Sequence, residues 1–380
     1  MNARSWRVSE LLAALGGKEP ERKTSMRKTI TAAVAVLATG LIATGCTSPS
    51  TTATAGTDAP ETLVVYSNSV SDGRGDWLKK EADNAGFKLR LVDLGGGDIR
   101  NRLLAEKANP IADVTFGLNN VYFESLKKAQ VLDAYTPSWA GKVDASAGDE
   151  AGKEYWPIVR EPVMLVYNKA AYTKPDQAPS DWPDLWTKKQ FAKRYEVPSD
   201  LGGATTQMVL AGILSRYRDD KGDLGVSQAG WDAVKAYFHD GLPAVPGTDL
   251  YAQIAAGKVD AGQMWLAGKA TREQQYKVST EAVHPKPGVP MVVQQVGLVK
   301  GTKKSAEAKK FIDWFGSAKV QAAWSKQFQT VPTNKDALAQ ADPAAVSATD
   351  SFTEQAIDWA FVAQHLDQWI EKIELDYLAN

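Results

Sequence analysis

The chain is poor in the two residue types that most often bind metals or carry covalent catalysis. Its 380 residues include one cysteine and three histidines. A single cysteine excludes an intrachain disulfide and any zinc site built from cysteine pairs. His239, His284 and His365 lie in no metal-binding or triad-like motif, and no G-x-S-x-G, H-E-x-x-H or P-loop pattern occurs. The sequence therefore predicts no catalytic residue, metal or cofactor, and a secreted hydrolase is only the alternative of another class.

An excess of positive charge is also absent. The first 45 residues hold 7 of the 44 Lys and Arg and 3 of the 45 Asp and Glu, which leaves 37 basic and 42 acidic residues and a net charge of −5. That balance argues against nucleic acid as a partner. The 335 residues that remain (380 minus 45) suit one large or two medium domains, and the hydrophobic content of 44% supports a sizeable core.

Long hydrophobic runs are missing too, and the one apolar stretch near the N-terminus is short. Arg27 and Lys28 precede an apolar run from Ile30 to Ile42, and small residues lead from there to Cys46. This order is typical of a secretory signal, and it resembles a bacterial lipobox, in which the cysteine is lipidated and becomes the new N-terminus. A membrane-spanning helix needs about 20 apolar residues, so the alternative of a small transmembrane anchor fits less well. A core thiol is the other alternative for Cys46.

The segment after Cys46 reads TSPSTTATAGTDAP over residues 47–60 and is too polar to fold. We therefore expect a signal peptide at 1–45, then the lipidated cysteine and a flexible tether at 46–60. A start of translation at Met26 is a hypothesis beside a start at Met1, because residues 1–25 are unlike a compact signal-peptide start. The expected location is the outer face of the cell membrane, extracellular or periplasmic, with the chain anchored by its lipid.

The part that should fold begins with alternating strand-like and helix-like segments. Apolar runs at 63–66, 88–92 and 113–117 are separated by helical stretches at 75–84 and 98–108. This alternation predicts an α/β fold with parallel βαβ units, in which ligands bind beyond the carboxyl ends of the strands. Polar segments follow all three strands, and they contain Ser67, Asn68, Ser69, Gly96, Gly97, Asn119 and Asn120.

A second group of segments follows after residue 160. Strands are expected at 163–167, 259–265 and 292–300, with a turn at Gly268 after the second of them. A glycine-bearing loop at 198–206 precedes a helix that begins near Thr205. The loop contains the candidate residues Gly203, Ala204, Thr205 and Thr206. Further helices are expected at 305–315, 318–328 and 352–377.

Four stretches resemble the substrate-binding proteins of bacterial ABC importers, and specifically the type 2 periplasmic-binding-protein fold. They read ETLVVYSNS, GGGDIRNRLLAEKANPIADVTFG, EPVMLVYNK and FIDWFGSAKVQAAWS, and the resemblance covers residues 61–380. The second stretch is the most specific and is similar to iron(III), phosphonate and sugar-phosphate binders. The resemblance implies two lobes joined by crossing strands near 163–168 and 292–299, with the ligand between the lobes.

The resemblance also implies the division of the chain and its partners. Lobe 1 is expected at 61–165, lobe 2 at 166–292, and a return to lobe 1 with C-terminal helices at 293–380. The partners are a small-molecule ligand, the transmembrane subunits of an ABC permease and, through the lipid, the membrane. The protein is expected to be a monomer.

The candidate ligand residues lie in the polar segments of both lobes, and each has a structural alternative. Turns or helix caps compete for the lobe 1 residues, and Asp98 is expected to cap the helix at 98–108. The alternative for Trp265 is a core position, and Tyr251 is expected to pack within a helix. Arg160 and Glu161 lie just before the crossing strand, where a structural role is favoured over a ligand contact. The candidates are Ser67, Asn68, Ser69, Gly96, Gly97, Asn119, Asn120, Gly203, Ala204, Thr205, Thr206 and Trp265.

The residue types favour an anionic ligand. Iron-binding relatives commonly carry two adjacent tyrosines where this chain has Met264 and Trp265, and no Tyr-Tyr pair occurs anywhere. Hydroxyls, amides and backbone N–H groups at helix starts suit phosphate or phosphonate better than ferric ion. The favoured ligand is a phosphorylated or phosphonate organic anion. The alternatives of the same fold are iron(III), thiamine and a polyamine, with Trp265 as a cation–π partner for the last two.

Overall fold

The computed structural model describes residues 61–378, within a compact unit that spans Asp58–Asn380. The expected signal peptide at 1–45, the hypothetical start at Met26 and the expected lipidation of Cys46 with its tether concern residues outside the described ones. In the described part of the chain, no helix is long and apolar enough to cross a membrane.

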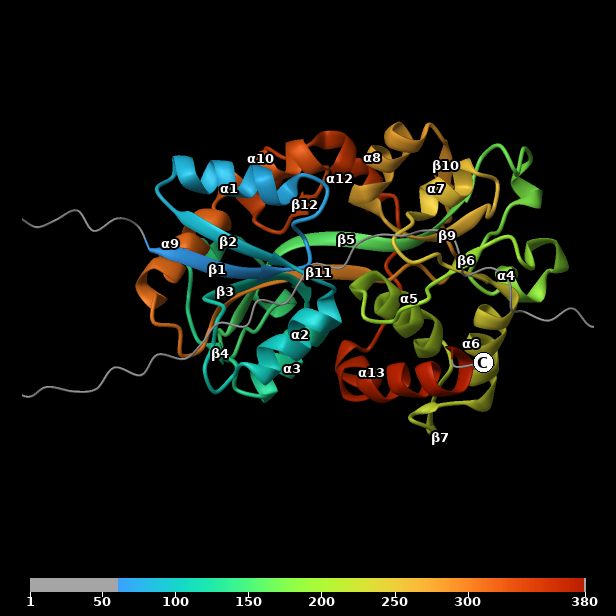
Figure 1. The fold of residues 1–380 in the computed structure, drawn as a ribbon, viewed down its shortest axis with the longest axis horizontal. Coiled ribbons are helices and arrows are strands. Elements are labelled where there is room, and N and C mark those ends of the chain that lie inside the picture. Colours follow the sequence, from blue (N-terminus) through green and yellow to red (C-terminus); the bar gives the residue numbers. More distant parts are fainter. Residues whose placement is uncertain (1–60, 379–380) are drawn as a thin grey trace, which may run out of the picture. The chain divides into compact units, whose positions relative to one another are not determined.

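The first lobe is built on a mixed sheet whose first three strands are parallel (Figure 1). β1 (Thr62–Ser67) pairs in parallel with β2 (Lys88–Asp93) and with β3 (Val114–Asn119). Helices α1 (Arg74–Asn84) and α2 (Gly96–Ala105) connect these strands. β1 and β3 are buried along almost their whole length, as expected of strands covered on both faces. The predicted βαβ units are therefore confirmed.

Two long antiparallel strands join the two halves of the described unit. β5 (Tyr155–Asn168) is a single strand of 14 residues, and β11 (Met291–Val299) runs beside it. The first half of β5 pairs with β11, and β11 pairs in turn with β3. The second half of β5 pairs with β9 (Ala261–Trp265) and β10 (Thr280–Ala282). β5 thus passes from one lobe to the other, as Figure 1 shows.

The second lobe surrounds the far half of β5 with helices and short strands. Its helix α5 (Ala204–Ser215) is buried at nine consecutive positions, Thr206 to Leu214, and forms the centre of this lobe. Its other elements are α4 (Asp184–Thr187), β6 (Glu196–Val197), β7 (Arg218–Asp223), α6 (Gln228–Asp240), β8 (Leu242–Pro243), α7 (Leu250–Ala255) and α8 (Leu266–Tyr276).

The C-terminal part returns to the first lobe and then reaches the second. Two helices cover the sheet of lobe 1, and the last long helix packs on helices of both lobes. The remaining helices and strands are α3 (Asn120–Lys128), β4 (Leu132–Asp133), α9 (Ser305–Phe315), α10 (Ala318–Phe328), β12 (Val331–Pro332), α11 (Lys335–Leu338), α12 (Pro343–Asp350), α13 (Trp359–Ile373) and a π-helical turn (Glu374–Leu378).

Two of the predicted C-terminal helices are confirmed and the third is wrong in extent. α9 and α10 have the predicted bounds. The expected helix at 352–377 is instead an irregular segment up to Asp358, followed by α13 from Trp359. The carboxylate of Asp358 accepts the Phe361 N–H and fixes this start, a cap that outweighs the apolar residues before it.

Three local predictions near the lobe junction are also corrected. Asp98 does not cap the helix after β2, because α2 begins at Gly96 with Gly95 in the cap position. Gly268 lies inside α8 and not in a turn, since the helix begins directly after β9. Arg160 and Glu161 lie within β5 and not before it, because the strand starts at Tyr155.

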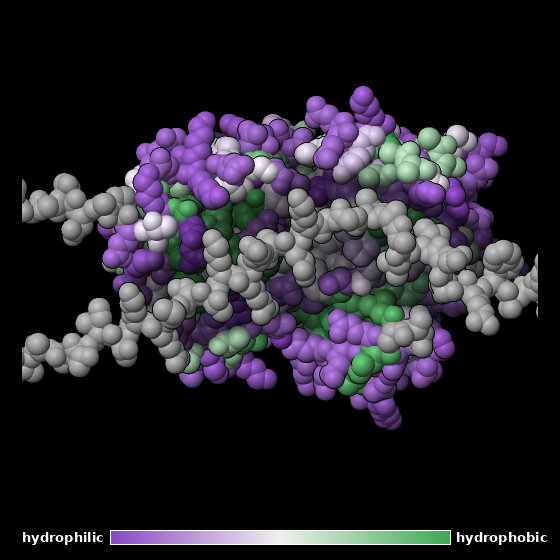
Figure 2. All heavy atoms as spheres, in the orientation of Figure 1, coloured by the Kyte–Doolittle hydropathy of each residue, from purple (hydrophilic) through white to green (hydrophobic). Residues whose placement is uncertain are grey.

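The cores of both lobes are rich in aromatic side chains. In lobe 1, Trp77, Trp324 and Phe328 make edge-on contacts with ring centroids 4.8–5.9 Å apart. In lobe 2, the ring of Tyr237 stacks on that of Tyr195 at 5.6 Å. The face shown in Figure 2 is mainly hydrophilic, with apolar residues visible chiefly in its recesses. Most of the tryptophan content thus serves packing.

Candidate ligand-binding cleft

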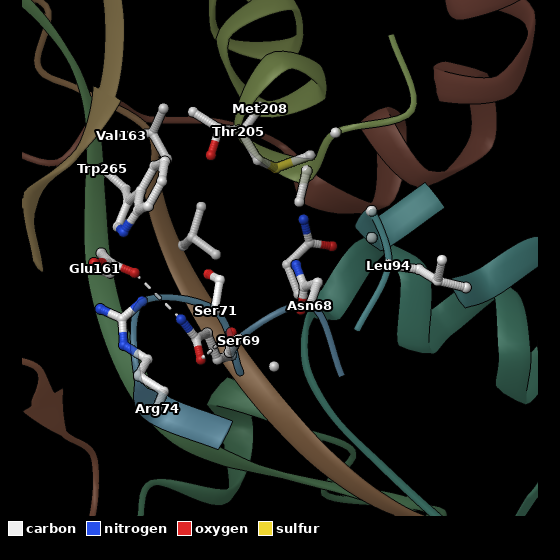
Figure 3. A pocket seen from close by; sticks show the side chains of 18 residues that line it. Asn68, Ser69, Ser71, Arg74, Leu94, Glu161, Val163, Thr205, Met208 and Trp265 are labelled. Atoms are coloured by element: carbon white, nitrogen blue, oxygen red, sulfur yellow. Dashed lines mark hydrogen bonds between the residues drawn. The ribbon is translucent and has the colours of Figure 1, made fainter. Parts of the chain in front are cut away.

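A cavity of about 330 Å³ lies where the two lobes meet at the crossing strands. Its volume is at the lower end of the range of about 300–1,000 Å³ that is usual for small-molecule sites. Lobe 1, lobe 2 and both crossing strands contribute to its walls, several of whose side chains are drawn in Figure 3. The lining residues are Asn68, Ser69, Ser71, Arg74, Leu94, Gly95, Gly96, Gly117, Asn119, Glu161, Val163, Gly203, Ala204, Thr205, Met208, Trp265, Val292 and Gln294.

The amides of Asn68 and Asn119 supply the polar lobe 1 wall. The side-chain oxygen of Asn119 accepts the Tyr122 N–H at 3.1 Å and caps α3. Its Nδ2 is buried without a partner, and Asn119 is only 1% exposed. Asn68 Oδ1 is likewise buried and unpartnered. Since buried polar atoms are normally hydrogen-bonded, these two amides are available for a ligand in the cavity.

Glycines at the start of α2 allow the two lobes to touch. A Cβ on Gly96 would lie 2.9 Å from Ala204 Cβ and 2.9 Å from Tyr122 Cε2. The backbone N–H of Gly97 donates to the carbonyl oxygen of Gly202 across the lobe junction at 3.1 Å. A side chain on Gly96 would force Ala204 or Tyr122 to shift, so glycine is favoured there by close approach, whereas a Cβ on Gly97 would require its neighbours to move by a few tenths of an ångström.

The start of α5 faces the cavity from the second lobe. Gly203 is in the cap position and provides no side-chain cap, so the first N–H groups of this helix remain available. Thr205 lines the cavity beside them. Thr206 does not, because its buried hydroxyl accepts a hydrogen bond of 2.7 Å from Gln263 Nε2 within the same lobe. The two uncapped helix starts, of α2 and α5, favour negative charge in the cleft.

A buried carboxylate lies at the other side of the cavity. Glu161, on β5, is 8% exposed, and its oxygens accept the Ala267 N–H at 3.0 Å and Gln294 Nε2 at 3.2 Å. Gln294 Oε1 accepts in turn from the hydroxyl of Ser69 at 3.1 Å. Burial raises the pKa of Glu161, an effect opposed by the positive charge of Arg74 and by these hydrogen bonds. Glu161 therefore has a structural role, since it accepts an N–H group at the start of α8, and it also lines the cavity.

Arg74 is the cation of the cleft. It begins α1, is 7% exposed, and its Nε is buried without a hydrogen-bond partner. Its guanidinium lies 5.6 Å from the ring centre of Phe328, and within residues 61–378 it forms no salt bridge. The carboxylate of Glu161 balances part of its charge without a salt bridge, and the guanidinium is still able to donate to an anionic group in the cavity.

Trp265 closes the cleft from lobe 2 and is held by an arginine. Arg272 lies over the Trp265 ring at 4.4 Å from its centre. The same guanidinium contacts Asp249 of lobe 2 at 2.7 Å and Asp72 of lobe 1 at 3.1 Å. Trp265 is therefore a cleft residue and not a core tryptophan. Tyr251 is fully buried in α7, as expected, with its hydroxyl 3.1 Å from Thr280 Oγ1.

Most of the predicted ligand residues come together in this cavity. Asn68, Ser69, Gly96, Asn119, Gly203, Ala204, Thr205 and Trp265 all line it. Four others lie elsewhere. Ser67 is fully buried, and its hydroxyl accepts the Ser69 N–H at 3.0 Å. Gly97 lies at the lobe contact, Asn120 faces a groove behind α3, and Thr206 is bonded inside lobe 2.

Several lining residues were not among the candidates because their segments look structural. Val163 and Val292 lie on apolar strands, and Met208 lies on the apolar α5. Among the lining residues outside the candidate list, Glu161 and Arg74 are the two that the sequence could have indicated. A charge within an apolar strand rarely occurs without a partner, and Arg74 follows the polar end of β1 by seven residues. The other additions are Ser71, Leu94, Gly95, Gly117 and Gln294.

Residues 79–353 match the family model of bacterial extracellular solute-binding proteins. The chain belongs to this family. It is 35% identical over 319 residues to a probable ABC transporter periplasmic-binding protein of Sinorhizobium fredii, which covers 83% of this chain and 86% of that protein. It is 25% identical over 336 residues to a Salmonella typhimurium periplasmic protein named for 2-aminoethylphosphonate binding, over 84% of this chain and 94% of that protein.

Solved structures agree on the fold. Iron-bound HitA from Pseudomonas aeruginosa superposes with a TM-score of 0.69 at 18% identity, over 83% of this chain and 99% of that one. AfuA from Actinobacillus pleuropneumoniae, with fructose-6-phosphate bound, gives a TM-score of 0.67 at 18% identity, over 83% and 98%. The predicted two-lobed type 2 periplasmic-binding-protein fold is thus confirmed. The chain is a solute-binding protein of an ABC importer, and its relatives are transport proteins and not enzymes.

Proposed function

We propose that the solute is a small organic anion that carries a phosphate or phosphonate group. The observation that carries the proposal is the convergence of unsatisfied donors on one cavity. The uncapped start of α5, the Nδ2 of Asn119 and the Nε of Arg74 all lack hydrogen-bond partners there. Phosphate and phosphonate oxygens accept several hydrogen bonds at once and are favoured at helix N-termini.

The donor set fits ferric ion less well. A hard cation such as Fe³⁺ prefers phenolate, carboxylate or imidazole ligands. The described cavity lining contains no tyrosine, histidine or aspartate, and Glu161 is its single carboxylate. Among residues 61–378, no three His, Cys, Asp or Glu side chains gather where a metal could be held. The name of one relative, for 2-aminoethylphosphonate, supports the same ligand class, whereas the solved structures at 18% identity include both a fructose-6-phosphate complex and an iron complex and do not discriminate.

The proposal includes the route of delivery. The mature chain is held by lipid at Cys46 on the outer side of the membrane and acts as a monomer. Ligand stabilises the closed arrangement of the lobes by its higher affinity for that state. The closed protein docks on the permease subunits and releases its ligand chemically unchanged.

Thermal melting tests the ligand class. The sample is the mature chain, residues 46–380, with Cys46→Ser, and the panel contains sugar phosphates, 2-aminoethylphosphonate, thiamine, a polyamine and ferric citrate. Ligand at about 100 times its Kd stabilises the folded state by about 2.7 kcal/mol, which raises the melting temperature measurably. The expected result is a shift with phosphorus-containing ligands, which mass spectrometry then recovers intact.

A shift with ferric citrate, thiamine or the polyamine alone would overturn the proposed ligand class. Conversion of the phosphorus ligand into a product would overturn the transport assignment in favour of an enzyme. Denatured protein is also checked for co-purified ligand by mass spectrometry, since a resident molecule would mask a shift.

A further inference from the structure

The start of α5 is supported from the first lobe as well as from its own. α2 and α5 meet at the lobe junction (Figure 1), where the carbonyl oxygen of Gly202 accepts the Gly97 N–H. One turn into α5, Gln207 donates from its Nε2 to the Leu201 carbonyl oxygen at 2.8 Å. Gln207 thereby fixes the loop that leads to the first N–H groups of α5.

Tyr122 connects Gln207 to the first lobe. It lies on α3, and its hydroxyl donates to Gln207 Oε1 at 2.6 Å, across 85 positions of sequence. Tyr122 is fully buried and Gln207 is 7% exposed. The tyrosine ring also lies against the start of α2, since a Cβ on Gly96 would be 2.9 Å from Tyr122 Cε2. One side chain of lobe 1 therefore contacts the start of α2 and, through Gln207, supports the start of α5.

These two side chains are not ligand contacts. The cavity lining contains neither Tyr122 nor Gln207. Gln207 instead lines a separate polar groove of about 420 Å³ at the lobe junction, together with Gly97 and Gly202. Their hydrogen bond therefore acts on the cleft through the position of α5 and not through the solute.

The hydrogen bond is suited to hold the lobes together. Burial raises the pKa of the Tyr122 hydroxyl, which therefore stays protonated and remains a donor. Hydrogen bonds in buried surroundings are stronger than those in water, and this one is broken when α3 and α5 move apart. The ion pair of Asp72 with Arg272 also crosses between the lobes, but its Asp72 side chain is 30% exposed, so it contributes less.

We propose that Tyr122 and Gln207 are positioning residues of the cleft, whose hydrogen bond seats the start of α5 against lobe 1 and stabilises the closed arrangement without help from the solute. Part of the ligand-free population is then already closed, and the solute binds to an α5 start that is in place. The closure part of this inference is independent of the proposed function, and only the choice of solute in its test rests on that function.

Spin labels on both lobes test closure without any ligand. Because Cys46 is the single cysteine, Cys46→Ser with Lys80→Cys on α1 and Gln275→Cys on α8 gives one label in each lobe, at exposed positions. Pulsed electron spin resonance of the ligand-free chain should show a population at the distance of the closed arrangement, and Tyr122→Phe should reduce it. Equal distance distributions in the two chains, or no closed population in either, would overturn the proposal.

Calorimetry with 2-aminoethylphosphonate tests the positioning role. Tyr122→Phe leaves Gln207 Oε1 without its donor in the closed arrangement, so the Kd should rise about five- to 150-fold. Adding Tyr122→Phe to Gln207→Met should not weaken binding further, because the pair is already lost. The matched control is Tyr251→Phe, whose buried hydroxyl contacts Thr280 within lobe 2. It should lower the melting temperature and leave both the Kd and the label distances unchanged.

The outcomes separate the two proposals. A wild-type Kd in Tyr122→Phe, or additive effects of Tyr122→Phe and Gln207→Met, would overturn the positioning role and leave the anion proposal standing. If no phosphorus ligand binds the wild-type chain, the proposed function fails, and the label distances still decide whether the hydrogen bond closes the lobes. If Tyr122→Phe does not fold, Gln207→Met breaks the same hydrogen bond and provides the comparison.

Discussion

Replacement of Gly97 by alanine should weaken ligand binding while it stabilises the lobe that carries the residue. Gly97 lies in the first turn of α2, and its φ is not in the left-handed region, so alanine fits the backbone. Alanine in a helix is more favourable than glycine by about 0.5–1 kcal/mol. The ligand-free variant should therefore melt no lower than the wild type.

The substitution should destabilise the closed arrangement of the two lobes. A Cβ on Gly97 would lie 3.1 Å from Gln207 Nε2 and 3.1 Å from the carbonyl oxygen of Gly202, and both belong to the second lobe. The Gly202 oxygen is backbone and cannot swing aside, and it also accepts the Gly97 N–H. Overpacking of this kind costs about 1–3 kcal/mol, so the Kd should rise by roughly 5- to 150-fold.

Titration calorimetry with the ligand found by the melting panel measures this change, and small-angle scattering reports closure. The matched control is Gly141→Ala, because Gly141 is exposed and a Cβ there would meet nothing within 4 Å. The expected order of Kd is Gly97→Ala far above Gly141→Ala, with the latter equal to wild type. An unchanged Kd in Gly97→Ala, or a lower melting temperature without ligand, would refute the closure argument.

Three further predictions concern the two threonines of α5, the ion pair of Asp72 and the buried Glu196. Thr205→Val should weaken a phosphorus ligand at least about tenfold in calorimetry at an unchanged melting temperature, whereas Thr206→Val should lower the melting temperature, because its hydroxyl is bonded within lobe 2. Equal effects of both on Kd would contradict this division. Asp72→Asn should raise Kd about two- to fivefold at low salt and less at high salt, since Asp72 bonds Arg272 across the lobes; a salt-independent effect would count against the ion pair. Burial raises the pKa of Glu196 from 4.5 to about 7, so folding takes up a proton between these values and stability should fall as the pH rises through that window. Urea unfolding at pH 5 and pH 8 should show this slope reduced in Glu196→Gln, and an identical slope would refute it.

The fold could be predicted from the sequence, because hydrophobic periodicity and the four family-like stretches can be recognised in short segments of the chain. The βαβ order of lobe 1 and the bounds of α9 and α10 follow from such patterns. Errors arose where a cap decided a boundary. The carboxylate of Asp358 starts α13 late, and Gly95 starts α2 early. The residue at which a helix begins depends on such local cap geometry, which composition and hydrophobic periodicity do not reveal.

The lining residues of the cleft could be predicted only in part, because the sequence does not show which way a side chain points. Polar loops after strands could be listed from the sequence, and eight of the twelve candidates line the cavity. The direction of each side chain could not be read in this way. Thr205 and Thr206 are neighbours on one helix, yet the first faces the cavity and the second is bonded inside its lobe. Glu161 and Arg74 meet across 87 positions of sequence, and only the tertiary fold brings them together.

Titration calorimetry of the mature chain with fructose-6-phosphate, 2-aminoethylphosphonate and ferric citrate tests the central claim most directly. The account predicts saturable binding of one molecule per chain for at least one phosphorus ligand, and its loss in Arg74→Gln, which removes the guanidinium of the cleft. Binding of ferric citrate alone, or a phosphorus ligand that binds equally well without Arg74 and Thr205, would contradict the assignment of this cavity to an organic phosphate or phosphonate.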